Sequence, residues 1–186
     1  MKIPPQAKRV FKGEIFDVYQ WEQEMFDGSR ETFEMLKRAN TTQVIAAGDN
    51  AIFIAEEQQP QRPAPYFTLF GGRVEDGEEP LAAAKRELME EAGMASADWE
   101  LWRTDEPVGK IEWTVYTYIA RGCKIIQAQQ LDAGEKIEIK KVSFDDFVSQ
   151  TANPSFRNLG ISFELLKLQT NPKKLEEFKQ KLFTKR

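Results

Sequence analysis

The stretch GRVEDGEEPLAAAKRELMEEAGM, residues 72–94, decides the fold of this chain. Its second half predicts an α-helix, because Pro80 suits the first helical turn and most residues after it are good helix formers. Gly93 follows at the position where helices commonly end in the left-handed conformation. Four apolar residues recur at helical spacing and are predicted to pack on a core: Leu81, Ala84, Leu88 and Ala92.

The neighbouring face of this predicted helix carries three acidic residues, Glu87, Glu90 and Glu91. Glu87 and Glu91 are four residues apart, and like charges at that spacing destabilise an isolated helix. A hard divalent cation would reverse the sign of that interaction, and Mg²⁺ commonly binds one or two carboxylates together with substrate phosphates. Taken alone, such a cluster indicates a solvated acidic face. The glycine-rich approach to the helix favours the metal site instead.

Residues 68–78 indicate a strand that enters a loop leading into the helix. Glycine lets the backbone approach a metal ion or a phosphate closely and adopt unusual dihedral angles. By itself, the pair Gly71-Gly72 would indicate an ordinary tight turn.

Composition narrows the functional classes. The chain has 186 residues, of which 41% are hydrophobic and 30% charged, as expected of one soluble globular core. The net charge of −4 favours neither nucleic acid nor an anionic membrane as a partner. No apolar run approaches the length of a membrane span, and the N-terminus lacks the apolar stretch of a secretory signal. Cys123 is the only cysteine, so we expect a cytoplasmic protein without an intrachain disulfide.

The chain contains no histidine, which excludes histidine-based triads and most zinc hydrolases. Acid–base chemistry must therefore come from carboxylates, lysine, tyrosine or metal-bound water.

The sequence pattern of residues 72–94 resembles the Nudix box, G-x5-E-x7-R-E-U-x-E-E-x-G-U with U apolar, at every defined position. The matching residues are Gly72, Glu78, Arg86, Glu87, Leu88, Glu90, Glu91, Gly93 and Met94. This resemblance implies a hydrolase that uses a divalent metal to cut the diphosphate of a nucleoside diphosphate linked to another group. It also implies an α/β (α+β) fold, the Nudix α/β/α sandwich with a mixed sheet, here preceded by a small N-terminal antiparallel β element.

The resemblance assigns expected roles to particular residues. The metal ligands would be the carbonyl of Gly71 with Glu87, Glu90 and Glu91, holding Mg²⁺, for which Mn²⁺ can substitute. Glu78 and Arg86 match a buried pair that ties the loop to the helix and supports the site.

The expected catalytic residues are Glu90, Glu91 and Glu135. Glu135 matches a general base or extra ligand on a mobile loop, with Asp132 as its nearest substitute. A solvated turn glutamate is the alternative for Glu135, and Glu90 is the next candidate for the base.

The rest of the chain predicts two parts: residues 1–39 as an N-terminal β-hairpin element, and residues 40–186 as the Nudix domain. Within them we expect a hairpin at 10–38 around Asp27-Gly28, strands at 41–47, 51–56, 113–120 and 137–142, a loop at 58–65, and helices at 143–150, 154–168 and 172–183.

The N-terminal hairpin resembles that of the ADP-ribose and ADP-sugar pyrophosphatase branch, where it forms a swapped homodimer. The implied reaction is hydrolysis of ADP-ribose to AMP and ribose 5-phosphate. The alternatives are another nucleotide sugar such as GDP-mannose, a dinucleotide, or a Nudix domain that senses a nucleotide without cutting it. Phe70 stands where the branch commonly has proline, a departure that bears on the substrate more than on the reaction.

A diphosphate also needs cations beyond the metal, and arginine suits phosphate. Arg62 and Arg73 are the predicted substrate-binding arginines, with surface charges as the alternative. Trp21 and Phe26 of the hairpin are candidates for the aromatic platform under the base, reaching a neighbour's site in the homodimer.

Overall fold

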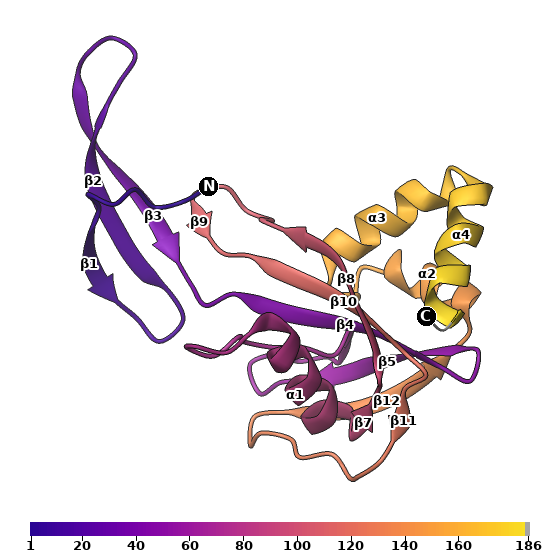
Figure 1. The fold of residues 1–186 in the computed structure, drawn as a ribbon. Helices are drawn as coiled ribbons and strands as arrows, with labels where there is room; N and C mark the ends of the chain where they lie inside the picture. The colour runs from indigo at the N-terminus through magenta and orange to yellow at the C-terminus, as the bar shows by residue number, and fades with distance from the viewer. Residues whose placement is uncertain (185–186) are drawn as a thin grey trace.

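The computed structural model describes residues 1–184, which form a mixed sheet covered by helices on both faces and a smaller sheet beside it (Figure 1). The mixed sheet contains β4 (Thr41–Gly48), β5 (Ala51–Gln58), β6 (Tyr66–Thr68), β8 (Asp98–Asp105), β10 (Val115–Arg121) and β12 (Lys136–Val142). The helices are α1 (Pro80–Ala92), α2 (Phe144–Thr151), α3 (Leu159–Gln169) and α4 (Pro172–Phe183). β7 (Met94–Ala95) and β11 (Lys124–Ile125) form a short two-stranded antiparallel sheet.

The strand order is β12-β5-β4-β10-β8, with β6 also paired to β5. β4 and β10 run parallel, and the remaining neighbours are antiparallel, so the sheet is mixed as predicted.

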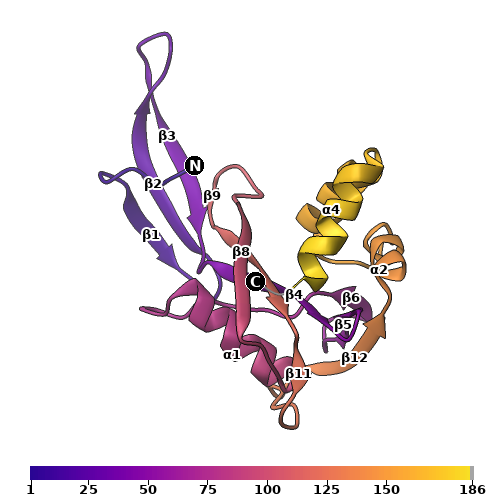
Figure 2. The same ribbon diagram turned by 45° about the vertical axis from the view of Figure 1, so that its right-hand side comes forward.

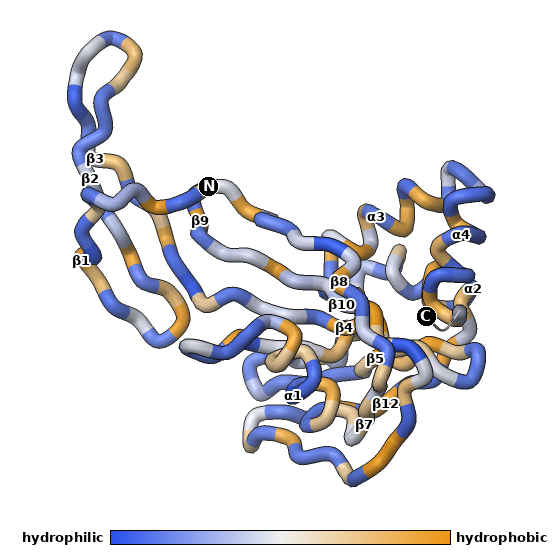
Figure 3. The backbone as a smooth tube through the Cα atoms, in the orientation of Figure 1, coloured by the Kyte–Doolittle hydropathy of each residue, from blue (hydrophilic) through white to orange (hydrophobic). Residues whose placement is uncertain are grey.

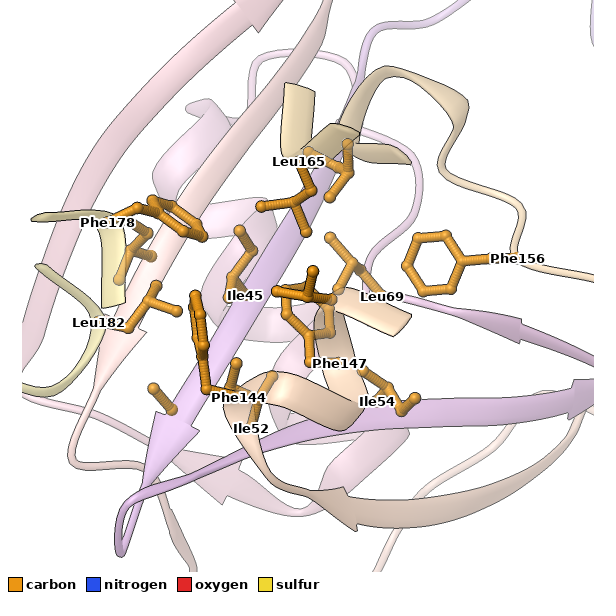
Figure 4. Packing of buried hydrophobic residues seen from close by; sticks show 14 residues of the cluster. Ile45, Ile52, Ile54, Leu69, Phe144, Phe147, Phe156, Leu165, Phe178 and Leu182 are labelled. Atoms are coloured by element: carbon orange, nitrogen blue, oxygen red, sulfur yellow. The ribbon is translucent and has the colours of Figure 1, made fainter. Parts of the chain in front are cut away.

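Two hydrophobic cores lie on opposite faces of this sheet, because successive side chains of a strand point to opposite sides. Val44 and Ala46 of β4 pack in the core that includes Leu88 of α1. Ile45 and Ala47 pack in the other core, to which α2, α3 and α4 contribute side chains (Figure 4). The predicted α/β/α sandwich is therefore confirmed.

The N-terminal residues form a separate antiparallel element that projects from the body of the molecule (Figure 2). It contains β1 (Lys8–Lys12), β2 (Asp17–Glu24) and β3 (Arg30–Lys37), so it has one strand more than the predicted hairpin. Gly28 has a φ of 82° in the loop between β2 and β3, a left-handed conformation that glycine adopts without strain. Met25 and the fully exposed Phe26 follow β2 in this loop, where Figure 3 shows an apolar segment.

A short strand from the second half of the chain completes the N-terminal sheet. β9 (Ile111–Glu112) runs parallel to the end of β3, pairing with Leu36 and Lys37. The N-terminal sheet and the mixed sheet are therefore connected at two neighbouring places, where β3 leads into β4 and where β9 leads into β10. The paired ends of β3 and β9 are called the seam below.

Most predicted elements are present, but one predicted helix starts later and one long strand was missed. α1 begins at Pro80 and ends before Gly93, whose φ of 61° is left-handed as predicted. The helix predicted from residue 154 begins only at Leu159. The side-chain oxygen of Asn158, just before it, accepts hydrogen bonds from the hydroxyl of Thr68 in β6 and from the backbone N–H of Leu69. β8 was not predicted. Among residues 1–184, no helix is long and apolar enough to cross a membrane.

Candidate active site

α1 positions the acidic residues by burying its opposite stripe. Ala84, Leu88 and Ala92 are fully buried against the sheet, which fixes the rotation of the helix. Glu91 is consequently drawn into the protein and is only 7% exposed. One of its carboxylate oxygens accepts a hydrogen bond from the backbone N–H of Gly71 at 2.7 Å. A buried carboxylate thus faces the loop that precedes the helix.

Gly71 and Gly72 form a short segment of backbone between β4 and α1, called the glycine ledge below. The carbonyls of Phe70 and Gly72 accept hydrogen bonds from Val44 and Thr42 of β4, at 2.8 and 2.9 Å. Gly71 lies between them and faces α1. Its φ is 146°, and a Cβ atom there would lie 2.2 Å from the carbonyl oxygen of Thr42, so only glycine fits.

Gly72 is required for a different reason. A Cβ atom at this position would lie 2.5 Å from a carboxylate oxygen of Glu87. The missing side chain therefore leaves the space that the Glu87 carboxylate occupies, which links the glycine of the sequence motif directly to the acidic face.

Arg86 connects the loop with the acidic face of α1. Its guanidinium contacts both oxygens of Glu78 at 3.1 Å, so the predicted pair is present, although it is half-buried rather than buried. The same guanidinium donates to Glu87 at 2.9 Å and to Glu90 at 3.0 Å. A further bond of 2.9 Å reaches the carbonyl of Arg73. Arg86 is thus the cation that currently neutralises part of the acidic face.

A cavity of about 370 Å³ opens above these residues. It brings together all the predicted metal ligands, all three candidates for the general base and one of the two predicted substrate-binding arginines. Its lining residues are Gly71, Gly72, Arg73, Glu75, Arg86, Glu87, Glu90, Glu91, Gln130, Asp132 and Glu135.

The carboxylates of this cavity repel one another. Burial raises the pKa of Glu91 well above its usual value, and the charges of Glu87, Glu135 and Glu57 add to the effect, while the Gly71 N–H opposes it. Burial also raises the pKa of Glu87 against the opposing effect of Arg86. The pKa of Glu135 is raised, first by burial and then by neighbouring acidic groups including Asp132. Burial and mutual repulsion therefore favour the protonated form of these three carboxylates.

Glu57 was not among the predicted site residues. It is buried on β5, and its charge contributes to the raised pKa values of Glu91 and Glu135. The hydroxyl of Tyr66 hydrogen-bonds to it, and burial followed by this contact raises the pKa of Tyr66. Alternation along β5 is the signal that could have revealed it, because Phe53 and Ala55 share its face toward α1.

A second cavity of about 750 Å³ adjoins the first, and Gly71 and Gly72 line both. Its walls carry three arginines and two aromatic residues from distant parts of the chain: Arg38, Arg103, Arg157, Trp113 and Phe163. None of these was predicted as a site residue, since nothing local in the sequence marks them.

The remaining predicted substrate contacts lie elsewhere within the chain. Arg62 has its guanidinium 5.0 Å from the ring of Tyr66. Trp21 packs on Phe33 within the N-terminal sheet, with ring centroids 5.1 Å apart. Phe26 lies in the β2–β3 loop, is fully exposed and lines neither cavity. Their roles as substrate contacts stay predictions.

A mixed sheet flanked by helices, with an acidic helix facing a glycine ledge, defines the class of Nudix-type hydrolases. The NUDIX domain family model matches residues 36–160, and the chain belongs to this family. The predicted family and the predicted hydrolase class are thereby confirmed.

Individual relatives are more distant. The chain is 24% identical over 142 residues to the ADP-ribose pyrophosphatase of Bacillus subtilis (strain 168), covering 75% of this chain and 77% of that protein. It is 24% identical over 145 residues to the methanol dehydrogenase activator of Bacillus methanolicus, covering 76% and 78%. A crystal structure of an ADP compounds hydrolase shares the fold, with a TM-score of 0.73, 17% identity and coverage of 91% and 94%.

Proposed function

We propose that this protein is a Mg²⁺-dependent diphosphatase of nucleoside diphosphate sugars, with ADP-ribose as the preferred substrate and AMP and ribose 5-phosphate as products. The observation that carries the proposal is the carboxylate cavity at the glycine ledge, which joins a larger cavity able to hold the remainder of such a substrate. Two relatives whose names specify ADP-ribose or ADP compounds support the choice of nucleotide.

The residues of the cavity fit a hard divalent cation in chemistry and charge. They offer carboxylate oxygens and a backbone carbonyl, the donors that Mg²⁺ prefers, and three of the carboxylates have pKa values raised first by burial and then by neighbouring acidic groups. As they stand, the side chains of residues 1–184 form no group of three or more metal-binding residues around one position. To bind the ion, Glu87 and Glu90 would therefore release their hydrogen bonds from Arg86.

We assign the roles as follows. Glu87, Glu90, Glu91 and the carbonyl of Gly71 would hold Mg²⁺, and Glu78 would keep Arg86 in place. Bound metal would polarise the diphosphate oxygens and lower the pKa of an attached water. Glu135 would accept the proton of the attacking water, and Arg73, on the wall of the same cavity, would bind a phosphate oxygen.

A substrate panel tests the reaction. The protein would be incubated with Mg²⁺ and ADP-ribose, GDP-mannose or a dinucleotide, and release of the nucleoside monophosphate would be measured with and without EDTA. We expect EDTA-sensitive release, fastest from ADP-ribose. Faster release from GDP-mannose or a dinucleotide would reassign the substrate, and no release from any member would favour a nucleotide sensor.

Gly72→Ala tests the metal site independently of turnover. The new methyl group would displace the Glu87 carboxylate, the end of a flexible side chain, so we expect the fold to survive. Loss of a correctly placed ligand should weaken metal affinity by roughly 10- to 100-fold, the size found when groups that orient metal ligands are lost. Gly109→Ala is the matched control, because a Cβ atom there meets nothing within 4 Å. Unchanged Mn²⁺ binding by calorimetry would show that Glu87 is not a ligand.

We further propose that residues 1–39 form a dimerisation element and residues 40–186 the catalytic domain, and that the protein is a homodimer. The N-terminal sheet and its loops expose several large apolar side chains: Val10, Phe11, Ile15, Met25 and Phe26. Exposed apolar surface of this kind commonly marks a protein contact. The predicted cytoplasmic location and the contribution of Phe26 to a neighbour's site remain predictions.

Analytical ultracentrifugation at micromolar concentration tests the assembly. We expect the full chain to sediment as a dimer, and the double variant Phe11→Ser, Phe26→Ser to shift toward monomer because it removes two exposed apolar contacts. Leu101→Ser on β8 serves as a control, because Leu101 is an exposed apolar residue outside the N-terminal element. A monomeric wild type would contradict the dimer.

A further inference from the structure

The backbone that leads into the glycine ledge changes its partner strand at Leu69. β6 pairs with β5 as far as Thr68, and from Phe70 onward the chain pairs with β4. Leu69 lies between these two pairings, and its backbone N–H donates to the side-chain oxygen of Asn158 at 2.8 Å. Leu69 is only 3% exposed, and its side chain packs in the core shown in Figure 4. An N–H buried at this point would be costly without a partner.

Asn158 replaces a backbone acceptor that the fold uses elsewhere. The chain before α3 runs parallel to β6, and the backbone N–H of Arg157 donates to the carbonyl of Phe67 at 2.9 Å. In a continued parallel ladder, the carbonyl of Arg157 would be the next acceptor for Leu69. That carbonyl accepts instead from the N–H of Leu159 at 3.0 Å, because the chain turns there into α3. The side-chain oxygen of Asn158 takes its place.

This use of the side chain costs α3 a capping bond. Asn158 is the N-cap residue of α3, a position at which asparagine commonly accepts a hydrogen bond from the first turn of its own helix. Within residues 1–184, its side chain forms no such bond. Asn171, the N-cap residue of α4, does form it and accepts from the N–H of Lys174 at 3.2 Å. The side chain of Asn158 therefore serves the approach to the ledge and not its own helix.

The side-chain nitrogen of Asn158 reaches the middle of the mixed sheet. It donates to the side-chain oxygen of Gln43 on β4 at 2.7 Å, and the Gln43 nitrogen donates to the hydroxyl of Thr117 on β10 at 2.7 Å. Both amides use their oxygen and their nitrogen, so each is fixed in one orientation. One row of hydrogen bonds thus holds the start of α3, two central strands and Leu69 together.

The position of the Gly71 carbonyl depends on this arrangement, because Gly71 follows Leu69 by two residues. The N–H of Gly71 reaches Glu91 at 2.7 Å, and a Cβ atom on Gly71 would lie 2.2 Å from the carbonyl oxygen of Thr42. Such close packing leaves little room for a change in where the chain leaves β6. Without the bond at Leu69, the segment would shift relative to β4 and carry the Gly71 carbonyl away from the carboxylates of α1.

We propose that Asn158 is a positioning residue for the glycine ledge, which fixes the backbone at Leu69 and so places the carbonyl of Gly71 for metal binding. This inference rests on the proposed function, because it takes that carbonyl as a ligand of the ion. Asn158 lines the larger cavity and does not line the carboxylate cavity, so it acts through the backbone and not by contact with the metal.

Amide hydrogen exchange of the metal-free protein tests the bond itself. In Asn158→Ala, we expect the amides of Leu69 and Gly71 to exchange roughly 2- to 10-fold faster than in the wild type, the scale of one lost hydrogen bond. Asn171→Ala is the matched control, because it removes the N-cap asparagine of α4 instead. It should lower the melting temperature and leave these two amides unchanged. Unchanged amides in Asn158→Ala, or equal acceleration in both variants, would overturn the proposal.

Calorimetric titration with Mn²⁺ tests the consequence for the metal site. Asn158→Ala should weaken Mn²⁺ binding by roughly 10- to 100-fold, the effect of losing a group that orients metal ligands, whereas Asn171→Ala should bind as the wild type does. Asn158→Asp keeps an oxygen that can accept from Leu69, so its affinity should stay near that of the wild type. An equal loss in Asn158→Asp and Asn158→Ala would contradict the role of the bond to Leu69.

The two measurements separate this inference from the proposed function. Equal Mn²⁺ binding by the wild type and Asn158→Ala would leave the metal site standing and overturn the role of Asn158. A wild type that binds no Mn²⁺, with faster exchange at Leu69 and Gly71 in Asn158→Ala, would contradict the proposed metal site and still support Asn158 as the residue that fixes the ledge.

Discussion

Replacing Glu91 with glutamine is expected to lower Mg²⁺-dependent turnover of ADP-ribose by about a hundred- to a thousand-fold, the scale of several kcal/mol of metal-derived stabilisation. Glutamine keeps the shape of the side chain and can still accept the hydrogen bond from Gly71. The loss would therefore come from the charge alone. Steady-state kinetics with saturating Mg²⁺ would measure it, and Glu31→Gln on the exposed face of β3 is the control. Near-normal turnover would show that the metal site lies elsewhere.

The same substitution is expected to raise the melting temperature of the metal-free protein. Burial raises the pKa of Glu91 in the folded state above its value in the unfolded chain. The wild type is therefore most favoured below the unfolded pKa and loses that stability as the pH rises through the raised folded pKa. The gap between the variant and the wild type should widen from about pH 4 toward neutrality. A constant gap across this range would contradict the assignment of the buried charge.

Replacing Glu135 with glutamine is expected to lower kcat by about a hundred- to ten-thousand-fold, the usual contribution of a general base. Glu135 lines the carboxylate cavity, and its raised pKa suits a group that takes up a proton. Its carboxylate turns back to the N–H of Asp132 at 3.3 Å, a long contact that it can release for a water molecule. The melting temperature should change little.

The pH–rate profile separates a base from a merely structural residue. The acid limb of kcat/KM should be lost in Glu135→Gln, whereas Asp132→Asn should retain it with a smaller loss of rate. Full activity in both variants would contradict the assignment, and Glu90 would then be the next residue to test.

The sequence predicted α1 well because the signals for this helix are local. Pro80, Gly93 and the apolar stripe depend on neighbours within a few turns, and the structure places each as expected. The carboxylate cavity was predictable for the same reason, since most of its lining residues come from one loop and one helix. β8 was missed because its residues are mostly half-buried, so they show no clean alternation of polar and apolar side chains.

The larger cavity could not be predicted, because its walls come from segments that only the tertiary fold brings together. Arg38 precedes the mixed sheet, Trp113 follows β9 and Phe163 lies on α3. The aromatic residues of the N-terminal element show that residue type alone can also mislead. Trp21 is an aromatic residue of the kind that can stack on a nucleotide base, but it packs on Phe33 within its own sheet.

The seam between the two sheets is held by short pairings. β9 has only two residues and is the edge strand of the N-terminal sheet, and backbone bonds join Leu36 to Lys110 and Arg38 to Glu112. Closing this seam links residues far apart in sequence, so it costs chain entropy that α1 and the glycine ledge do not share. Short, peripheral pairings open at lower free energy than a buried sheet. We therefore expect the seam to open at lower free energy than the part of the fold that holds the carboxylate cavity.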